Sequence, residues 1–435
     1  MGRDQDKNAE NIGTSLTRRS LFQRAGLAIA AAALPPAAAL AGQVAGQKAG
    51  EGAANQAGAP KAPGQSVSPA MEKLSAYMSE AGSRALPDEV VEKAKQHILD
   101  TFAAMISGSP LLPGRDAFRF ARAYGGGNTA TIVASNILCG PIEAALTNGM
   151  LAHSDETDDS NGPSHSHPGC AVVPGVLAAG EQFGIDGTRF VRAVTLGYDV
   201  GCRVTITLGG ERYETDSHRS THSIATIFGA AAAAGCAASL NSQQMRLTLG
   251  YAAQECSGLT AWRRDTQHVQ KAFVFAGMTA RSGVTAALLV QLGWSGVSDI
   301  FSGKNNFFLA YDPQANPAGL IDQLGVRYEI ARTDIKKWSV GSPIQAPLDA
   351  LVILQKRHPF NADRVQQVVV RLAPLEVLTV NNREMPDICL QYIVAVMLLD
   401  KTVTFHSAHD FARMKDPAVL RERAKVKLIP DPALT

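Results

Sequence analysis

Residues 226–240 read TIFGAAAAAGCAASL, a run dominated by alanine and glycine. Side chains this small project little from a helix, so neighbouring helices must approach its backbone closely. The run therefore predicts a central helix in a tightly packed helical bundle. A membrane-spanning segment is the alternative, and it is disfavoured because His222 and Asn241-Ser242-Gln243 place polar residues at both ends of the run.

The segments before this run also have helical patterns. Ser68-Pro69 has the form of an N-cap followed by proline at the first helical position. Pro87-Asp88 opens a clearer helix, with apolar residues at helical spacing and Gly108 placed to end it. Further helices rich in small residues are expected over 141–150, 171–182 and 188–204.

The pattern of residue types changes after about residue 265. One long helix is expected over 268–292, whereas 365–372 is rich in β-branched residues and 424–429 alternates as a half-buried strand should. The expected fold is mainly α. It has a large all-α domain over 68–265 and a smaller α+β domain over 266–435.

The first residues have the features of an export signal. Residues 17–22 read TRRSLF, a twin-arginine pattern, and an apolar run over 25–34 and a small-residue cleavage site over 39–41 follow. We expect a Tat-type signal over 1–42, recognised by the twin-arginine export machinery, and a periplasmic or secreted protein. An uncleaved anchor or a chance alanine-rich leader is the alternative. The Gly/Ala/Gln/Pro-rich stretch over 43–67 is expected to be a disordered linker.

The composition is that of a globular protein, and the length is sufficient for two domains of ordinary size. The 435 residues are 46% hydrophobic, and 41 Lys and Arg balance 39 Asp and Glu. This balance argues against a general nucleic-acid binder, which normally carries a basic stripe. Outside the leader no segment approaches the ~20 apolar residues that a transmembrane helix needs, so none is expected to insert stably into a membrane. Six cysteines without a CxxC pair argue against zinc-ribbon and thioredoxin-like sites, and we expect buried free thiols.

The densest polar cluster is HSDETDDS over 153–160, closed by HSHP over 165–168. Four carboxylates within five residues repel one another, so at least one should have a raised pKa unless cations offset them. Such carboxylates beside imidazoles are the groups that general acid–base catalysis uses. From the loop alone, three interpretations stay open: a solvated acidic loop, a divalent metal site, and a proton-transfer site without a metal.

Several dispersed motifs resemble the signature of the MmgE/PrpD family. NGMLAH over 148–153 matches its N-G-x-x-A-H start, Asp158-Asp159-Ser160 its paired aspartate followed by Thr or Ser, and His167-Pro168-Gly169 its His-Pro at a helix start. Residues 187–203 resemble its G-x-x-F-x-x-A-x-x-x-G-Y-E helix, and residues 222–229 its histidine-led helix start.

Later residues continue the resemblance in the same order. Lys271 precedes a helix with regularly placed small residues, and Lys336-Lys337-Trp338 stands where a lysine followed by an aromatic residue is expected. The resemblance runs from about Ser68 to the C-terminus. The family includes 2-methylcitrate dehydratase, cis-aconitate decarboxylase and iminodisuccinate epimerase. It implies a homodimer with a helical domain, an α+β lid and a pocket between them.

The resemblance also implies a set of site residues. Carried over position by position, the site of the family's decarboxylases falls on Glu156, Ser160, His167, His222, Lys271 and Lys336. This sequence departs from the family pattern at two positions, and both differences bear on the identity of the substrate. Glu156 stands where decarboxylases have Asp, and Ser160 stands where Thr is usual. One extra residue also separates Ser160 from His167.

On this resemblance His167 is the expected acid and base, and His222 a second proton-transfer or orienting group. The acidic residues, Asp158 among them, would set the ionisation and orientation of these histidines. Lys271, Lys336 and the pair Arg263-Arg264 would hold substrate carboxylates. The alternatives are a capping or packing role for His167 and solvated surface positions for the lysines and arginines. His153 is expected to be a structural hydrogen-bonder.

The expected function is elimination from a small polycarboxylic acid by proton abstraction, as in 2-methylcitrate dehydratase, without metal or cofactor. Isomerase, epimerase or decarboxylase action is the alternative within the family. A metal-dependent hydrolase is a rival from another class, built on Asp155, Asp158, Asp159, His165 and His167. A second rival is a non-catalytic periplasmic carboxylate binder, because the chain ends soon after 424–429, earlier than family members that return to the helical domain.

Overall fold

The computed structural model describes residues 66–434. The expected export signal over 1–42 and all but the last two residues of the expected linker over 43–67 lie outside the described residues, so both stay predictions. The described chain is mainly α, as the sequence predicts.

Two large hydrophobic cores divide the described chain, beside a small separate cluster of Ala117, Leu146, Met150 and Ala272. The first core takes in residues from Met71 to Ile330. Its helices and strands are α2 (Pro69–Glu80), α3 (Asp88–Gly108), α4 (Leu112–Tyr124), β1 (Ala130–Thr131), β2 (Leu138–Cys139), α5 (Pro141–Ala152), α6 (Gly169–Phe183), α7 (Gly187–Leu208), α8 (Gly210–Ser217), α9 (Thr221–Ala237), α10 (Ser242–Glu255), α11 (Val269–Ala272), α12 (Met278–Gln291) and α13 (Phe307–Tyr311).

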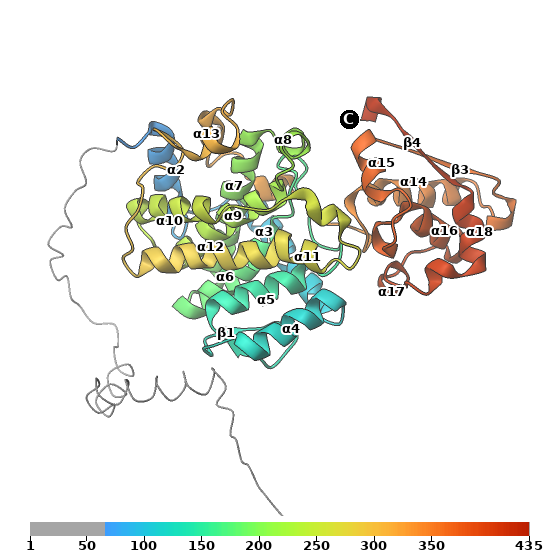
Figure 1. Cartoon of the computed structure of the whole chain (residues 1–435), viewed down its shortest axis with the longest axis horizontal. Coiled ribbons are helices and arrows are strands. Elements are labelled where there is room, and N and C mark those ends of the chain that lie inside the picture. Colours follow the sequence, from blue (N-terminus) through green and yellow to red (C-terminus); the bar gives the residue numbers. More distant parts are fainter. Residues whose placement is uncertain (1–65, 435) are drawn as a thin grey trace, which may run out of the picture. The chain divides into compact units, whose positions relative to one another are not determined.

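The alanine- and glycine-rich run is the centre of the first core. It forms most of α9, whose residues are all buried, and α9 packs against α6, α7, α10 and α12 (Figure 1). Glycines allow α7 to approach α9 at backbone distance. A Cβ on Gly197 would lie 2.9 Å from the carbonyl oxygen of Gly229, and one on Gly201 would overlap the carbonyl oxygen of Ala225. The predicted central helix is therefore confirmed.

The helix expected over 268–292 is present but not uniform. It consists of α11, a π-helical turn over Phe273–Gly277, and α12. By length and composition Val269–Gln291 is apolar enough to cross a membrane, contrary to the expectation that no segment after the leader approaches this. However, 67% of its most apolar window is buried, because α12 packs against α5, α9 and α10 in the first core.

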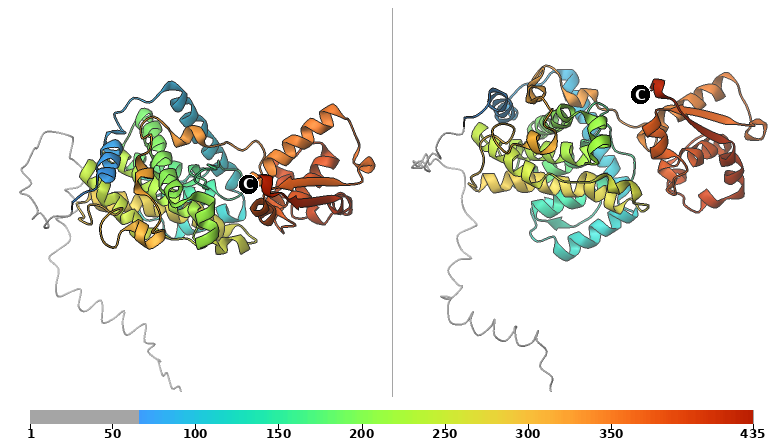
Figure 2. Two further views of the ribbon diagram at one scale, coloured as in Figure 1. Left: turned by 90° about the horizontal axis from the view of Figure 1, so that it is seen from above. Right: turned by 45° about the horizontal axis from the view of Figure 1, so that its top comes forward.

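The second core takes in residues from Val340 to Val426. It contains a parallel pair of strands in which Val368 lies opposite Val426, and Figure 2 shows the helices that surround this pair in orange to red. The elements of this core are α14 (Ser342–Arg357), β3 (Val368–Leu372), α15 (Pro374–Val380), α16 (Leu390–Asp400), α17 (Phe405–Ala408), α18 (Pro417–Ala424) and β4 (Val426–Pro430). Both expected strands are confirmed within a few residues.

The boundary of the expected domains needs correction. The change of core falls between Ile330 and Val340 rather than after residue 265, because α12 buries its small-residue face in the first core. The first domain is helical apart from β1 and β2, which form a two-residue antiparallel pair.

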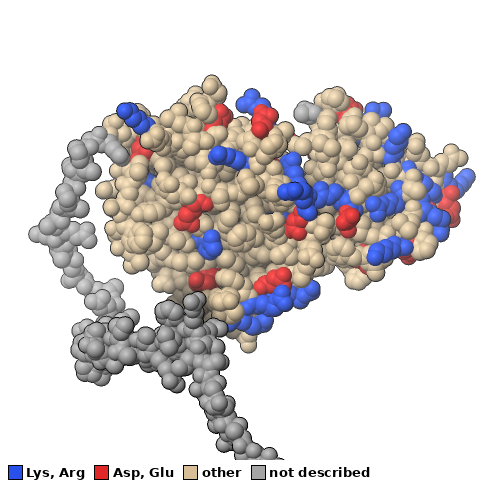
Figure 3. Space-filling view, viewed as in Figure 1, with Lys and Arg blue, Asp and Glu red and all other residues tan. Residues whose placement is uncertain are grey.

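The cysteines and the surface agree with the composition. All six cysteines are buried free thiols, as expected: Cys139, Cys170, Cys202, Cys236, Cys256 and Cys389. On the face shown in Figure 3, basic and acidic side chains are interspersed, and wide areas carry neither.

Candidate active site

Two adjoining cavities bring most of the expected site residues together. The larger, of about 260 Å³, is lined by His167, His222 and Ser160. The smaller, of about 110 Å³, shares five polar or aromatic residues with it, which are Glu156, Trp262, Arg263, Lys271 and Thr379. The loop after α5, the start of α9 and the segment before α12 supply these groups, although they are far apart in the sequence.

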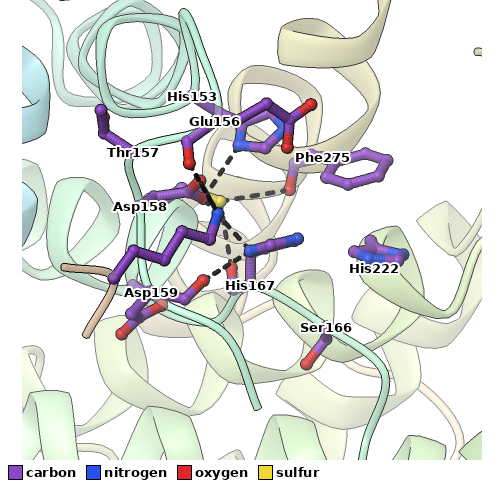
Figure 4. A network of polar contacts seen from close by, with 12 residues as sticks. His153, Glu156, Thr157, Asp158, Asp159, Ser166, His167, His222 and Phe275 are labelled. Carbon is purple, nitrogen blue, oxygen red and sulfur yellow. Dashed lines mark hydrogen bonds and ion pairs between the residues drawn. The ribbon is translucent and has the colours of Figure 1, made fainter. Parts of the chain in front are cut away.

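His167 is held as a neutral base. Its Nδ1 lies 2.5 Å from the backbone carbonyl oxygen of Asp159, and a carbonyl only accepts, so Nδ1 carries the hydrogen. The Nε2 atom of this tautomer offers a lone pair. Burial lowers the pKa of His167 well below its usual value, and the ammonium of Lys336 lowers it further. His167 therefore remains unprotonated at neutral pH. Figure 4 shows its contact with Asp159.

His222 is oriented by a buried glutamate that sequence reasoning missed. The Nδ1 atom of His222 lies 3.3 Å from Oε2 of Glu214, which also accepts hydrogen bonds from the backbone and hydroxyl of Thr221. Burial lowers the pKa of His222 to about 4, although the hydrogen bond to Glu214 opposes this. The rings of His167 and His222 are stacked with centroids 5.0 Å apart, so two neutral imidazoles line one cavity.

Glu214 itself stays ionised. Burial alone would raise its pKa, but hydrogen bonds with His165 and His222 hold that pKa well below the usual range. Arg263 donates to its other oxygen at 2.9 Å. This arrangement resembles the carboxylate–imidazole pairs that fix a histidine tautomer in other sites. Glu214 lies in GERYETDS over 210–217, an acidic stretch with no local pattern that distinguishes this residue from a surface carboxylate.

Phe275 provides an aromatic surface for the histidines. Its ring centroid lies 4.1 Å from that of His222 and 4.7 Å from that of His153, and both pairs are stacked. Phe275 lies in the π-helical turn that interrupts the long helix, and such turns often occur at functional sites. Sequence reasoning missed this residue because helical periodicity does not reveal an inserted residue.

Glu156 and Lys271 form a buried ion pair beside the histidines. Burial would raise the pKa of Glu156, but the ammonium of Lys271 holds it well below its usual value. Lys271 lines both cavities, and its Nζ lies 5.0 Å from the ring centroid of Trp262. Of the two predicted lysines, Lys271 is therefore the one whose ammonium reaches the cavities.

Lys336 lies beneath the cavities. Its Nζ donates to the backbone carbonyl oxygen of Glu156 at 2.8 Å and lies 3.6 Å from Asp158, and the side chain is 3% exposed. Lys336 lines neither cavity. Lys336 therefore supports the loop that carries Glu156. Its ammonium is not placed to contact a substrate in either cavity. Arg264 is exposed and also lines neither cavity.

Asp158 and His153 form a buried pair behind His167. Asp158 Oδ2 lies 2.8 Å from Nδ1 of His153. Burial raises the pKa of Asp158 well above its usual value and lowers the pKa of His153 to about 3, so burial favours the neutral forms of both. The hydrogen bond expected of His153 is therefore present.

The residues of the rival metal site do not converge. Asp155 pairs with His409 at 3.0 Å, and Asp159 accepts from His97, Tyr198 and the backbone of Gly169. In the described part of the chain, the sets of three close ligand groups are instead His153, Asp158 and Cys170, and His165, Glu214 and His222. The second of these sets also has the guanidinium of Arg263 at 2.9 Å from its carboxylate.

Comparison with known proteins agrees with this architecture. Residues 72–319 match the MmgE/PrpD N-terminal domain, and residues 338–435 match the MmgE/PrpD C-terminal domain. The break between the two matches coincides with the change of core between Ile330 and Val340.

Three curated relatives are similar at 23–26% identity. They are the cis-aconitate decarboxylase-like protein oryM of Aspergillus oryzae (25% over 68% of this chain), human cis-aconitate decarboxylase (26% over 79%) and Aspergillus terreus cis-aconitate decarboxylase (23% over 73%). The matches span 64%, 73% and 69% of the relatives' own lengths. These relatives support a lyase or decarboxylase function at the level of the family. Because the two domain matches together cover most of its length, the chain belongs to the MmgE/PrpD family.

Proposed function

We propose that this protein is a lyase that acts on a small polycarboxylic acid by proton transfer at the carbon next to a carboxylate. The observation that carries the proposal is the pair of neutral imidazoles, His167 and His222, that line one cavity beside the ammonium of Lys271. Each ring commits Nδ1 to a buried acceptor, which leaves Nε2 for chemistry.

In the proposed reaction, Nε2 of His167 takes a proton from the carbon next to a substrate carboxylate. The electrons of the broken C–H bond form an enediolate, whose charge Lys271 offsets in a site shielded from water. When the enediolate collapses, the C–O bond to a β-hydroxyl breaks, and an imidazolium returns a proton so that water leaves. Return of the proton to the opposite face would instead give epimerisation.

Decarboxylation uses the same groups differently. If a carboxylate leaves as carbon dioxide, the electrons of the broken C–C bond stay on carbon, and an imidazole that has taken a proton from solvent delivers it to that carbon. The relatives named as cis-aconitate decarboxylases favour this branch, and the differences at Glu156 and Ser160 leave the substrate open. We propose that ammonium and imidazole groups supply the charge stabilisation in either branch, without a metal.

The test is exchange of substrate hydrogen with solvent. A panel of di- and tricarboxylates is incubated with the protein in deuterated water and followed by NMR, which detects proton transfer even where net turnover is slow. We expect exchange or conversion for at least one acid, and a loss of about 100-fold or more in His167→Gln, as for removal of a general base. His358→Gln, at an exposed position, is the matched control.

Two results would contradict the proposal. Folded His167→Gln and His222→Gln variants that both exchange within a few-fold of the wild type would remove both histidines from the chemistry. Saturable binding by the wild type without any exchange or conversion would favour the non-catalytic carboxylate binder instead.

We also propose that the protein is exported by the twin-arginine pathway and acts outside the cytoplasm. The motif over 17–22 supports this proposal. Replacing Arg18 and Arg19 with lysine should leave the protein in the cytoplasmic fraction, and unchanged fractionation would refute it. A homodimer, which the family resemblance implies, is tested by light scattering on the purified protein.

A further inference from the structure

The smaller cavity has an excess of positive charge. Its charged lining residues are Glu156, Asp265, Arg263, Lys271 and Arg383. His268, which also lines it, has a pKa lowered to about 3 by burial and is neutral. Three cations therefore face two carboxylates in this cavity.

The cations are not equally compensated. Lys271 is paired with Glu156, and Arg263 with Glu214. Asp265 accepts hydrogen bonds from the backbone of Gln267, Gln270 and Lys271, so it caps the start of α11.

Arg383 has no carboxylate partner within residues 66–434. Its guanidinium donates to two backbone carbonyl oxygens, that of Arg263 at 2.9 Å and that of Thr379 at 3.4 Å. A guanidinium has five N–H donors, so these bonds fix its position and leave donors free. Met385 and Ile388, both buried, supply an apolar part of the same cavity wall, which strengthens electrostatic attraction.

The cavity of Arg383 continues into the cavity of the histidines. Glu156, Trp262, Arg263 and Lys271 line both. Lys271 Nζ lies 5.1 Å from the ring centroid of Phe275, which stacks on His222. A small acid that reacts at the histidines can therefore extend past Lys271 toward Arg383.

We propose that Arg383 is a specificity-determining residue that binds a carboxylate of the substrate remote from the reacting carbon. Arginine suits this task because its planar guanidinium can bind a carboxylate through two parallel hydrogen bonds. The inference rests on the proposed function for the position of the reacting carbon. It assigns a binding residue to the carboxylate that such a polycarboxylic acid carries beyond the one that Lys271 contacts.

The test measures binding, which does not require turnover. The probes are tricarballylate, a tricarboxylate without a leaving hydroxyl, and pentanoate, which has a chain of the same length and a single carboxylate. We expect the full-length wild type to bind tricarballylate more tightly than pentanoate. Arg383→Gln should weaken tricarballylate binding by about tenfold or more, the usual scale for a charge-assisted pair, while pentanoate binding changes by about twofold or less.

Controls separate charge from folding. Arg357→Gln, at an exposed position on α14, should bind both probes as the wild type does. Arg383→Met keeps much of the aliphatic stem without the charge, and it should show the same loss if the glutamine variant does not fold. A tricarballylate-to-pentanoate affinity ratio unchanged by these variants would overturn the subsite, as would a wild type that binds the two probes equally or binds neither.

The two proposals fail in different ways. Absence of both hydrogen exchange and conversion in the wild type would remove the proposed chemistry and leave the binding ratio intact. Continued exchange with a ratio insensitive to Arg383 would remove the subsite alone.

Discussion

The expected chemistry of His167 and His222 depends on the group that each ring contacts through Nδ1. A backbone carbonyl fixes the tautomer of His167, whereas the Glu214 carboxylate fixes that of His222. The first partner cannot be removed by substitution, because it belongs to the backbone. The second can, which makes Glu214 the place to test orientation separately from proton transfer.

We predict that Glu214→Ala lowers the exchange rate by about 10- to 100-fold, the scale seen when a group that orients a functional histidine is lost. Because Glu214 opposes the fall in the pKa of His222, its removal should also move the acidic limb of the pH–rate profile to lower pH. Glu214→Gln should keep more of the rate, since its amide oxygen can still accept from Nδ1. The profile is measured by the NMR exchange assay.

The control for this prediction is Asp216→Asn, an exposed change on the same helix. It should alter neither the rate nor the profile. A Glu214→Ala variant that loses rate with an unshifted acidic limb would indicate a purely structural role.

Metal removal separates the proposal from the rival hydrolase. We expect protein dialysed against EDTA, and then assayed with EDTA present, to keep its exchange rate within about twofold, because the charge stabilisation assigned to Lys271 needs no bound ion. Elemental analysis of the same samples checks that metals have been removed. Loss of exchange on dialysis, with recovery on adding Zn²⁺ or Mn²⁺, would refute the metal-free proposal.

The sequence predicted much of the candidate site but not its support. The motifs marked Glu156, Ser160, His167, His222 and Lys271, which the structure gathers at two adjoining cavities. Glu214, Phe275 and Arg383 were missed. Their roles depend on long-range packing, which residue type and local spacing do not reveal.

At the scale of elements, the contact between α7 and α9 determines how much extra side-chain volume the first core tolerates. The two helices approach so closely that glycine is required at the crossing. The start of α9 carries His222, so this crossing also helps to position the candidate site.

We predict that Gly201→Ala destabilises the protein by about 1–3 kcal/mol, the usual cost of overpacking a well-filled core. The added methyl group would overlap the carbonyl oxygen of Ala225, which cannot move without shifting α9. Gly187→Ala is the matched control on the same helix, because its Cβ would meet no atom within 4 Å. Urea unfolding of both variants gives the comparison, and equal stabilities would contradict the packing argument.

The elements were predicted where the local signal was strong. The cap at Ser68, the helix ending at Gly108 and both strands of the second core followed from local chemistry. The π-helical turn over Phe273–Gly277 and the β1–β2 pair did not. One depends on an inserted backbone residue and the other spans two residues per strand, so neither produces a periodic pattern.

At the scale of the whole molecule, one ion pair joins the two cores. His409, which follows α17, contacts Asp155 of the loop after α5 at 3.0 Å through Nε2, while its Nδ1 faces the carbonyl oxygen of Phe405. Burial alone would lower the pKa of His409, but Asp155 and the nearby Asp387 raise it to about 9. The imidazole is therefore charged at neutral pH.

We predict that His409→Gln costs more stability at pH 6 than at pH 10. A group with a raised folded-state pKa stabilises fully below its unfolded pKa of about 6.5, and this contribution is lost as the pH rises through about 9. The difference between the two pH values should be on the order of 3 kcal/mol. Urea unfolding of the wild type and the variant at both pH values gives the measurement.

The control for this linkage is His358→Gln, an exposed change near the end of α14. Its effect on the unfolding free energy should be small at both pH values. If His409→Gln costs the same at pH 6 and pH 10, the pair with Asp155 is not the source of the stability.

The six buried thiols have a consequence for how the chain can be made. While the chain is open, an oxidant can join six cysteines into three bridges in 15 ways, and none corresponds to the folded protein, whose thiols are all free. Once the cores close, the same sulfur atoms are beyond the reach of the oxidant. Yield under oxidising conditions should therefore be decided by a race between collapse and crosslinking, and a reductant should be needed only until the chain has folded.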